Sequence, residues 1–189
     1  MIQNDTFKFV VHRENFLSVS QCQKLMRYLE TGEPTESELA GQYDKNIMNK
    51  EVRNTEEMIY TDEKMLSKIK MVLELSNIST YHYNIQEMSS VKLLKYGVGG
   101  RYKWHTDCGA KETSTRKLTA IIQLSDENDY QGGDLEFGIT DKTGQNNYTA
   151  TRKQGSIIIF PAFLSHRVTP ITEGKRYSML SWMLGDTFV

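Results

Sequence analysis

Three side chains that could share one metal ion lie in the second half of the sequence. His105 and Asp107 form an H-x-D triplet, and residues two apart in an extended backbone point to the same side. His166 follows the apolar segment Ser156–Phe160 after a short proline-containing turn, so we expect it near a strand end. Two neutral imidazoles and one carboxylate leave coordination positions open, which is typical of Fe(II) sites that take a cosubstrate and O₂. A structural zinc site would more often have four ligands, including cysteine.

An arginine at the head of an apolar strand face indicates an anion site. Burying a guanidinium is costly unless an anion pairs with it. A dicarboxylate could be that anion, held by Arg176 in a bidentate contact that Ser178 assists. The alternative is an arginine that reaches water at the strand entrance. Alternation over Arg176–Leu184 places five side chains on this face: Arg176, Ser178, Leu180, Trp182 and Leu184.

The remaining histidines and the cysteines have ordinary interpretations. His12 and His82 lack carboxylate neighbours at a useful spacing, so we expect structural or surface roles. Cys108 directly follows the aspartate and could coordinate a metal or be oxidised if exposed, although packing is favoured. The only other cysteine is Cys22, and two cysteines are too few for a disulfide scaffold.

Length and charge exclude several functional classes. The chain has 189 residues, which suits one domain with a core of ordinary size. Its 23 Lys and Arg against 24 Asp and Glu give a net charge of −1, which argues against a basic nucleic-acid platform or an electrostatic membrane binder. The N-terminal residues lack the pattern of a signal peptide, and no apolar run approaches the ~18 residues of a membrane span. We therefore expect a soluble, cytoplasmic protein with no nucleic-acid or membrane partner.

Before residue 88 the patterns favour helices. After a short strand over Phe7–His12, Ser18 and Gln21 have the spacing of a capping box, and apolar residues then recur at helical spacing. A second helix is expected to begin at Thr61–Glu63. The polar segment Thr31–Glu57 between them has no strong period and is interpreted as a solvated loop or, as the sharper hypothesis, a lid over a site.

From residue 88 onward, short strands alternate with breaks rich in glycine. Such a pattern predicts a β-sandwich or barrel. Ile157–Phe160 is apolar on both faces, so this strand should be central. The expected strands are Val91–Tyr96, Leu118–Leu124, Asp134–Phe137, Tyr148–Arg152, Ser156–Phe160, His166–Val168 and Arg176–Leu184.

The order of these motifs resembles the Fe(II)/2-oxoglutarate dioxygenases, and more narrowly the prolyl 4-hydroxylase-like group with its short bacterial and phage forms. The likeness covers about half the chain. It consists of the H-x-D triplet, the GGDLEF segment Gly132–Phe137, the GSIIIFP segment Gly155–Pro161, a histidine, and Arg-x-Ser ten residues after that histidine.

The resemblance implies a mainly β fold with flanking helices. Residues 88–189 would form a double-stranded β-helix, or jelly roll, with the metal at one open end. Residues 1–87 would support this core with helices, so that residues 1–189 make a single domain. Gly132–Phe137 would be structural.

The resemblance also implies roles for individual residues. His105, Asp107 and His166 would be the iron ligands. Arg176 would bind the distal carboxylate of 2-oxoglutarate, where many relatives have lysine. The residues that bind this cosubstrate would be Arg176, Ser178, Tyr96 and Gln123.

The resemblance also concerns three residues that are not metal ligands. Gln123 occupies a place where some relatives have a tyrosine that touches the distal carboxylate, so its role is open. Tyr102 and Trp104 flank the first ligand, where relatives hold the substrate.

The implied activity uses Fe(II), 2-oxoglutarate and O₂ to hydroxylate an unactivated C–H bond and releases succinate and CO₂. L-Ascorbate is expected to serve as a reductant. A peptidyl proline or another peptidyl residue is favoured as substrate over a small molecule or free amino acid. The oligomeric state is open, and a phage-encoded protein would act in the cytoplasm of its host.

Two other classes of function stay open. The first is a jelly-roll module that binds metal without turnover, which the complete set of ligands together with Arg176 disfavours. The second is a cupin-like enzyme or zinc hydrolase, which would leave the Arg-x-Ser motif without a function. Under the oxygenase interpretation, Thr31–Glu57 and Cys108–Lys117 are the segments we expect to act as lids.

Overall fold

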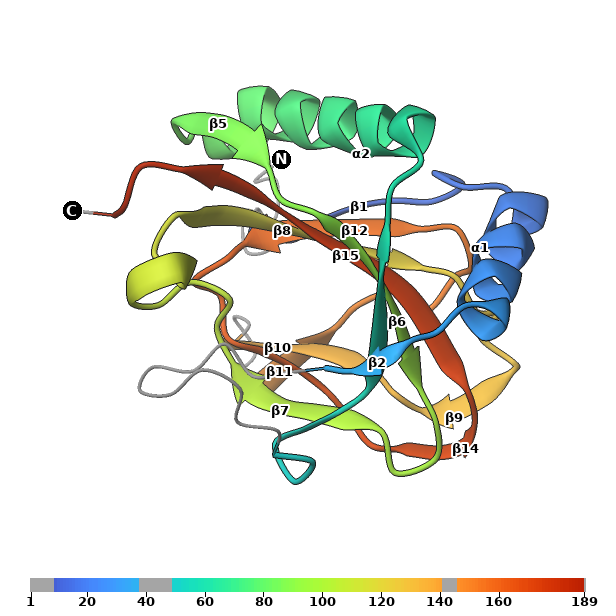
Figure 1. Ribbon diagram of the computed structural model, residues 1–189. Helices are drawn as coiled ribbons and strands as arrows, with labels where there is room; N and C mark the ends of the chain where they lie inside the picture. The colour runs from blue at the N-terminus through green and yellow to red at the C-terminus, as the bar shows by residue number, and fades with distance from the viewer. Residues whose placement is uncertain (1–8, 38–48, 141–145, 189) are drawn as a thin grey trace, which may run out of the picture.

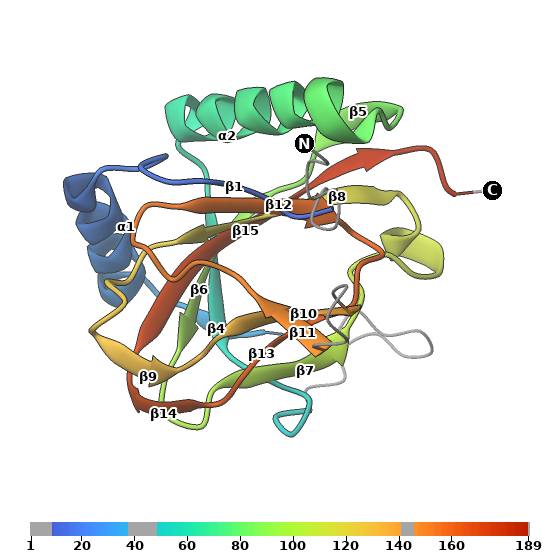
Figure 2. The ribbon, with the colours of Figure 1, turned by 180° about the vertical axis from the view of Figure 1, so that it is seen from behind.

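Two antiparallel sheets face each other, and two helices cover the outer face of the larger sheet (Figure 1). This computed structural model describes residues 9–37, 49–140 and 146–188. The view from behind shows the same layers, with α1 and α2 on one side of the larger sheet and the smaller sheet on the other (Figure 2). The fold is mainly β, and it is the jelly roll that the motif order predicts.

The larger sheet contains most of the strands expected from the sequence. Its central strands lie near the expected positions, and β6 has the expected bounds. β12 pairs with a neighbour on each side, which confirms that this apolar strand is central. In spatial order the strands are β1 (Val11–Arg13), β12 (Ile157–Pro161), β8 (Arg116–Gln123), β15 (Arg176–Gly185), β6 (Val91–Tyr96), β4 (Glu56–Tyr60) and β2 (Thr35–Glu36), and β5 (Ile85–Met88) also pairs with β15.

The smaller sheet lies across the core from the larger one. A separate two-stranded sheet, β9 (Tyr130–Gly132) with β14 (Ile171–Gly174), closes one end of the molecule. The order in the smaller sheet is β11 (Asn146–Thr149), β10 (Leu135–Thr140), β13 (His166–Val168), β7 (Arg101–His105) and β3 (Arg53–Asn54).

Side-chain alternation in the larger sheet divides the apolar core in two. In β12, Ile157 and Ile159 pack beneath the helices, whereas Ile158 and Phe160 pack between the sheets. Burial on both faces explains why this strand is a continuous apolar run.

Both helices begin where the sequence predicts. α1 (Val19–Thr31) has a complete capping box between Ser18 and Gln21, and it buries Cys22, Leu25 and Leu29 against the sheet. α2 (Glu63–Ser76) starts at Asp62, whose carboxylate accepts a hydrogen bond from the Met65 amide at 2.8 Å. It buries Ile69, Val72 and Leu73, and one turn of π-helix, η2 (Asn77–Tyr81), follows it.

Besides the two helices and the one short strand that the sequence predicts, the N-terminal half also contributes β2–β5. β4 and β5 extend the larger sheet, and β3 extends the smaller one. Their short or polar sequences carry little strand signal, and pairing with β6, β15 and β7 stabilises them.

The segments expected to be lids differ in what the structure describes. Thr31–Glu57 contains β2, β3 and the start of β4, while residues 38–48 lie outside the described residues. Cys108–Lys117 contains one 3₁₀ turn, η3 (Lys111–Thr113), and the start of β8. Of the expected strand Phe7–His12, residues 7 and 8 lie outside the described residues, and β1 runs from Val11 to Arg13.

The GGDLEF segment has the structural role that the resemblance implies. Gly132 has φ +70°, and a Cβ there would lie 2.0 Å from the Pro170 carbonyl oxygen, so only glycine fits. Further along the segment, Leu135 and Phe137 are buried between the sheets.

No helix within the described ranges is both long and apolar enough to cross a membrane. The single-domain organisation over residues 1–189 stays a prediction.

Candidate metal centre and cosubstrate pocket

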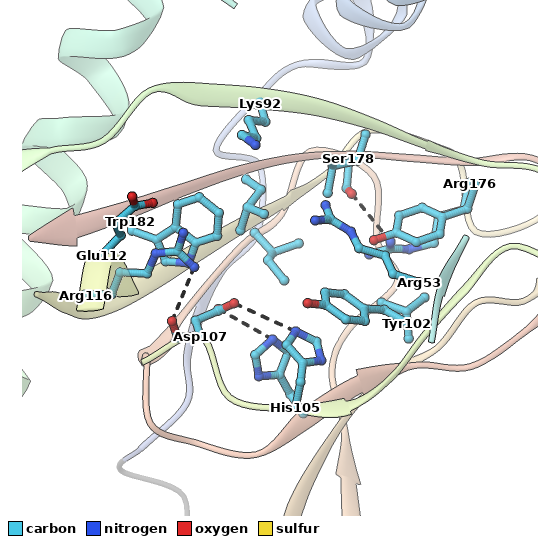
Figure 3. A pocket seen from close by; sticks show the side chains of 16 residues that line it. Arg53, Lys92, Tyr102, His105, Asp107, Glu112, Arg116, Arg176, Ser178 and Trp182 are labelled. Carbon is cyan, nitrogen blue, oxygen red and sulfur yellow. Dashed lines mark hydrogen bonds and ion pairs between the residues drawn. The ribbon is translucent and has the colours of Figure 1, made fainter. Parts of the chain in front are cut away.

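His105, Asp107 and His166 come together at one end of the space between the sheets. Their potential ligand atoms all lie within 4.8 Å of one another. His105 Nε2 is 3.8 Å from one Asp107 oxygen, and His166 Nε2 is 3.6 Å from the other (Figure 3). The side chains that the sequence singled out therefore meet in space.

Two neighbouring strands of the smaller sheet carry the histidines. β13 pairs with β7 so that His166 lies opposite His105 and Val168 lies opposite Tyr102. Two residues along β13 thus correspond to three along β7, which is a β-bulge. The bulge brings Tyr102 and His105 to the same face, and their rings stack with centroids 3.5 Å apart.

Backbone carbonyls orient both imidazole rings. His105 Nδ1 lies 2.7 Å from the Lys103 oxygen, and His166 Nδ1 lies 2.9 Å from the Leu164 oxygen. A carbonyl only accepts, so Nδ1 carries the proton in each ring and Nε2 presents a lone pair toward Asp107. Burial, together with His166, lowers the pKa of His105 to about 3, so this imidazole is neutral at physiological pH.

Contacts from the larger sheet hold Asp107. Its amide donates to the Ala162 carbonyl at 2.8 Å, and its carboxylate accepts a 2.6 Å hydrogen bond from the Thr119 hydroxyl. Burial opposes ionisation of this carboxyl, but His166, His105 and Thr119 outweigh it and keep its pKa below the usual value. The site therefore offers a carboxylate oxygen beside two imidazole nitrogens.

A cavity of about 260 Å³ extends from these ligand atoms into the space between the sheets (Figure 3). One wall carries His105 and His166, and the larger sheet supplies the opposite wall. Strand alternation confirms the predicted face of β15, because four of its side chains line the cavity: Arg176, Ser178, Leu180 and Trp182.

Arg176 is the most deeply buried cation of the cavity wall, at 1% exposure. Its guanidinium contacts neutral groups: Nη2 donates to Gln123 Oε1 at 2.8 Å, Nη1 lies 3.5 Å from Ser178 Oγ, and the Tyr96 ring centroid is 5.3 Å from its central carbon. Among the described residues it forms no ion pair, and its buried Nε has no hydrogen-bond partner. An anion inside the cavity would offset this buried charge.

The expected binding residues divide into those that line the cavity and those that do not. Tyr96 and Tyr102 line it, and the Tyr102 hydroxyl points toward its centre (Figure 3). Gln123 lies behind Arg176 rather than on the wall. Trp104 is 40% exposed outside the cavity, where the Arg167 guanidinium stacks on it at 4.8 Å. Alternation around the β7 bulge turns Trp104 away from the site.

Sequence reasoning missed three cations that line the cavity. Arg116 stacks on the Trp182 ring at 3.8 Å, and its Nη1 donates to the Asp107 carbonyl at 3.3 Å. Arg53 and Lys92 approach from β3 and β6, and both bind Glu57. The sequence placed Trp182, on which Arg116 stacks, on the cavity face of β15. It gave no such indication for the three cations, because their positions depend on long-range strand pairing.

The remaining histidines and Cys108 lie apart from the ligand cluster. His12 and His82 are exposed. The Cys108 thiol lies 3.8 Å from the Ser114 carbonyl, and burial raises its pKa. The described cluster of possible metal ligands does not include it.

Comparison with known proteins identifies the family. The family model of the 2OG-Fe(II) oxygenase superfamily matches residues 91–184, which contain the three ligand candidates and Arg176. Residues 91–184 therefore belong to the 2OG-Fe(II) oxygenase superfamily. Membership of this superfamily implies Fe(II), 2-oxoglutarate and O₂ as the reaction components.

Curated relatives of this chain include PKHD-type hydroxylases. One from Synechococcus sp. (strain CC9902) is 31% identical over 99 residues, which is 52% of this chain and 43% of the relative. Another from Shewanella oneidensis is 33% identical over 93 residues, which is 47% of this chain and 40% of the relative. The chain thus matches less than half the length of these relatives.

Solved structures of the superfamily share the fold across nearly the whole chain. A Pseudomonas putida prolyl-4-hydroxylase superposes with a TM-score of 0.74 at 15% identity, covering 94% of this chain and 93% of that one. A Trichoplax adhaerens prolyl hydroxylase, solved with a hypoxia inducible factor peptide fragment, gives 0.77 at 18% identity, covering 94% and 84%. The fold is therefore that of prolyl hydroxylases, including the N-terminal half that the family model does not match.

Proposed function

We propose that this protein is an Fe(II)- and 2-oxoglutarate-dependent dioxygenase that hydroxylates a C–H bond of a prolyl or another peptidyl residue and releases succinate and CO₂. One observation carries the proposal: a single cavity contains a His-Asp-His donor set and, deeper inside, a buried arginine with no acidic partner among the described residues.

The donor set fits Fe(II). Two imidazole nitrogens and one carboxylate oxygen converge, their orientations are fixed by backbone carbonyls and Thr119, and the cavity leaves space on the open side. When bound, Fe(II) supplies the O₂ activation that couples oxidative decarboxylation of 2-oxoglutarate to C–H hydroxylation.

The protein's own residues orient the reactants and exclude water. Arg176 binds the distal carboxylate of 2-oxoglutarate through charge-assisted hydrogen bonds, and Tyr96 covers one side of that end. Leu94, Ile121 and Leu180 make part of the cavity wall apolar. The 2-oxo acid is thereby held in one orientation, with its distal carboxylate at Arg176 and its 2-oxo end toward the metal ligands.

The mouth of the cavity favours a peptide. The Arg116 guanidinium is stacked on Trp182 and forms no ion pair among the described residues, so it can donate to a substrate carbonyl. The neighbouring Tyr102 hydroxyl stays neutral, because burial raises its pKa to about 12. The peptide complex of the Trichoplax adhaerens prolyl hydroxylase supports a polymer substrate for this fold.

The test is an anaerobic titration of the metal-free protein with Fe(II) and then 2-oxoglutarate. We expect the visible charge-transfer band that a 2-oxo acid gives on chelating Fe(II), and we expect Asp107→Ala to lose it. Iron binding without the band would contradict the oxygenase proposal and favour a metal-binding module.

The substrate class needs a second measurement. Proline-containing peptides should stimulate succinate release, and Arg116→Ala should raise the KM for the peptide while leaving the affinity for 2-oxoglutarate unchanged. Stimulation only by free amino acids would favour the small-molecule alternative. We also expect L-ascorbate to extend multiple turnover, and we expect the protein to act in the cytoplasm.

A further inference from the structure

We propose that Gln123 is a positioning residue: it holds the Arg176 guanidinium at the depth that selects a five-carbon 2-oxo diacid. This inference rests on the proposed function, because it concerns the cosubstrate of that site. Gln123 acts through Arg176, so it would not itself touch the cosubstrate.

Gln123 contacts Arg176 on the side of the guanidinium that faces away from the cavity. The side chain is 2% exposed and does not line the cavity. In the sheet it lies opposite Ser178, two residues along β15 from Arg176. From there its Oε1 accepts the 2.8 Å hydrogen bond from Arg176 Nη2. The amide therefore fixes one end of the guanidinium and leaves the cavity side of the group open.

The orientation of the Gln123 amide is determined by its two partners. Its Nε2 donates to the Thr151 carbonyl at 3.4 Å, and its Oε1 accepts from Arg176. A carbonyl only accepts and a guanidinium only donates. A flipped amide would place the Gln123 oxygen against the Thr151 carbonyl and the Gln123 NH₂ group against the guanidinium. The carbonyl oxygen of Gln123 therefore stays directed at Arg176.

A neutral acceptor at this position preserves the charge of Arg176. Glutamate would reach the same guanidinium, pair with it and compete with the carboxylate of a cosubstrate. Glutamine supplies the geometry of that contact without neutralising the charge.

The other surroundings of Arg176 leave Gln123 as its closest hydrogen-bond partner. Ser178 Oγ is 3.5 Å away, and Tyr96 packs on the guanidinium face. A Cβ at Gly133 would lie 3.2 Å from the Arg176 Cδ, so the glycine leaves room for the stem but offers no side-chain contact. Removing the Gln123 carbonyl therefore removes the main restraint on Nη2.

The test compares two ligands of the Fe(II)-loaded protein under anaerobic conditions. 2-Oxoglutarate has the distal carboxylate, and 2-oxopentanoate has the same chain length without it. The Kd of each is read from the charge-transfer band, which does not depend on turnover.

We expect Gln123→Leu to raise the Kd for 2-oxoglutarate about tenfold and to leave the weaker Kd for 2-oxopentanoate unchanged. Gln123→Glu, which is nearly isosteric, should raise the Kd for 2-oxoglutarate about 100-fold through ion pairing with Arg176. Ser181→Ala is the matched control, because Ser181 is equally buried on β15 and bonds Ser89 instead.

Each outcome decides the proposal. Equal losses for both ligands would show a merely structural role, and unchanged 2-oxoglutarate binding in both variants would show no role; either result overturns the inference. Should Gln123→Leu fail to fold, Gln123→Met takes its place, because methionine keeps the length of the side chain and removes the carbonyl acceptor. A wild-type protein without any band would instead refute the proposed function.

Discussion

At the scale of single residues, the candidate metal ligands are oriented before any ion is bound. Each imidazole is fixed by a carbonyl two residues before it in the chain, and Asp107 is fixed by a hydroxyl from the opposite sheet. Such preorganisation lowers the conformational cost of binding an ion.

Thr119→Val tests this orientation. Valine has the same shape as threonine but cannot donate the 2.6 Å hydrogen bond to the Asp107 carboxylate. We expect the affinity for Fe(II) to fall about tenfold, measured by competition with a chelating dye. Thr55→Val is the control, because the buried Thr55 hydroxyl donates to the Lys95 carbonyl. An unchanged affinity in Thr119→Val would contradict the role of this contact.

Arg176→Met separates cosubstrate binding from metal binding. Methionine keeps the apolar stem and removes the buried charge. The affinity for 2-oxoglutarate should fall about 100-fold, because charge-assisted hydrogen bonds are lost, while the Kd for Fe(II) changes less than twofold. A variant that binds 2-oxoglutarate normally would place the distal carboxylate elsewhere.

Spacing along the chain predicted the residues that lie near one another in sequence or on one strand face. His105 and Asp107 are two apart, and Arg176 and Ser178 share a face of β15. The contact between Gln123 and Arg176 spans 53 residues and depends on the pairing of β8 with β15. No local pattern encodes that register, so the contact of Gln123 with Arg176 was visible only in the structure.

At the scale of elements, the β7 bulge decides which aromatic side chain reaches the site. Regular alternation would put Tyr102 and His105 on opposite faces, and the extra residue puts both toward the cavity. Alternating apolar residues gave β6 its correct bounds, whereas Arg101–His105 mixes charged and aromatic residues and was not recognised as a strand. Bulges and polar strands depend on their partners, which a single sequence does not show.

A carboxylate links three strands beside the cavity. Glu57 on β4 binds Arg53 of β3 at 3.1 Å and also binds Lys92 of β6. Burial alone would raise the pKa of Glu57, but its contacts with Lys92 and Arg53 outweigh burial and lower it from 4.5. Because the folded-state pKa lies below the unfolded one, this stabilisation is present above about pH 5 and is lost as the pH falls through the folded-state value.

Glu57→Gln should therefore lower the free energy of unfolding by about 1 kcal/mol at pH 7 and reduce its dependence on pH below about pH 5. Urea titrations at several pH values measure both effects. Glu36→Gln is the control, because the Glu36 contact with Lys50 is exposed and should contribute little. Parallel pH profiles for Glu57→Gln and the wild type would contradict this assignment.

At the scale of the whole molecule, the larger sheet separates a supporting core from the core around the site. The helices pack on one face of this sheet, and the cavity lies on the other. The solved prolyl hydroxylases share the fold at 15–18% identity, so the fold tolerates extensive substitution. Stability and ligand binding should then respond differently to changes in the two cores.

Leu73→Ala and Phe137→Leu test this separation. Leu73 is fully buried on the inner face of α2, and its truncation should lower the free energy of unfolding by about 2–5 kcal/mol without changing the Kd for Fe(II). Phe137 packs between the sheets against Phe160 at 4.8 Å and lies 6.1 Å from the His166 ring, so Phe137→Leu should also weaken Fe(II) binding by at least threefold. Denaturant unfolding and metal competition measure the two effects on the same samples. Loss of metal affinity in Leu73→Ala, measured where that variant is fully folded, would show that the larger sheet transmits changes between the cores.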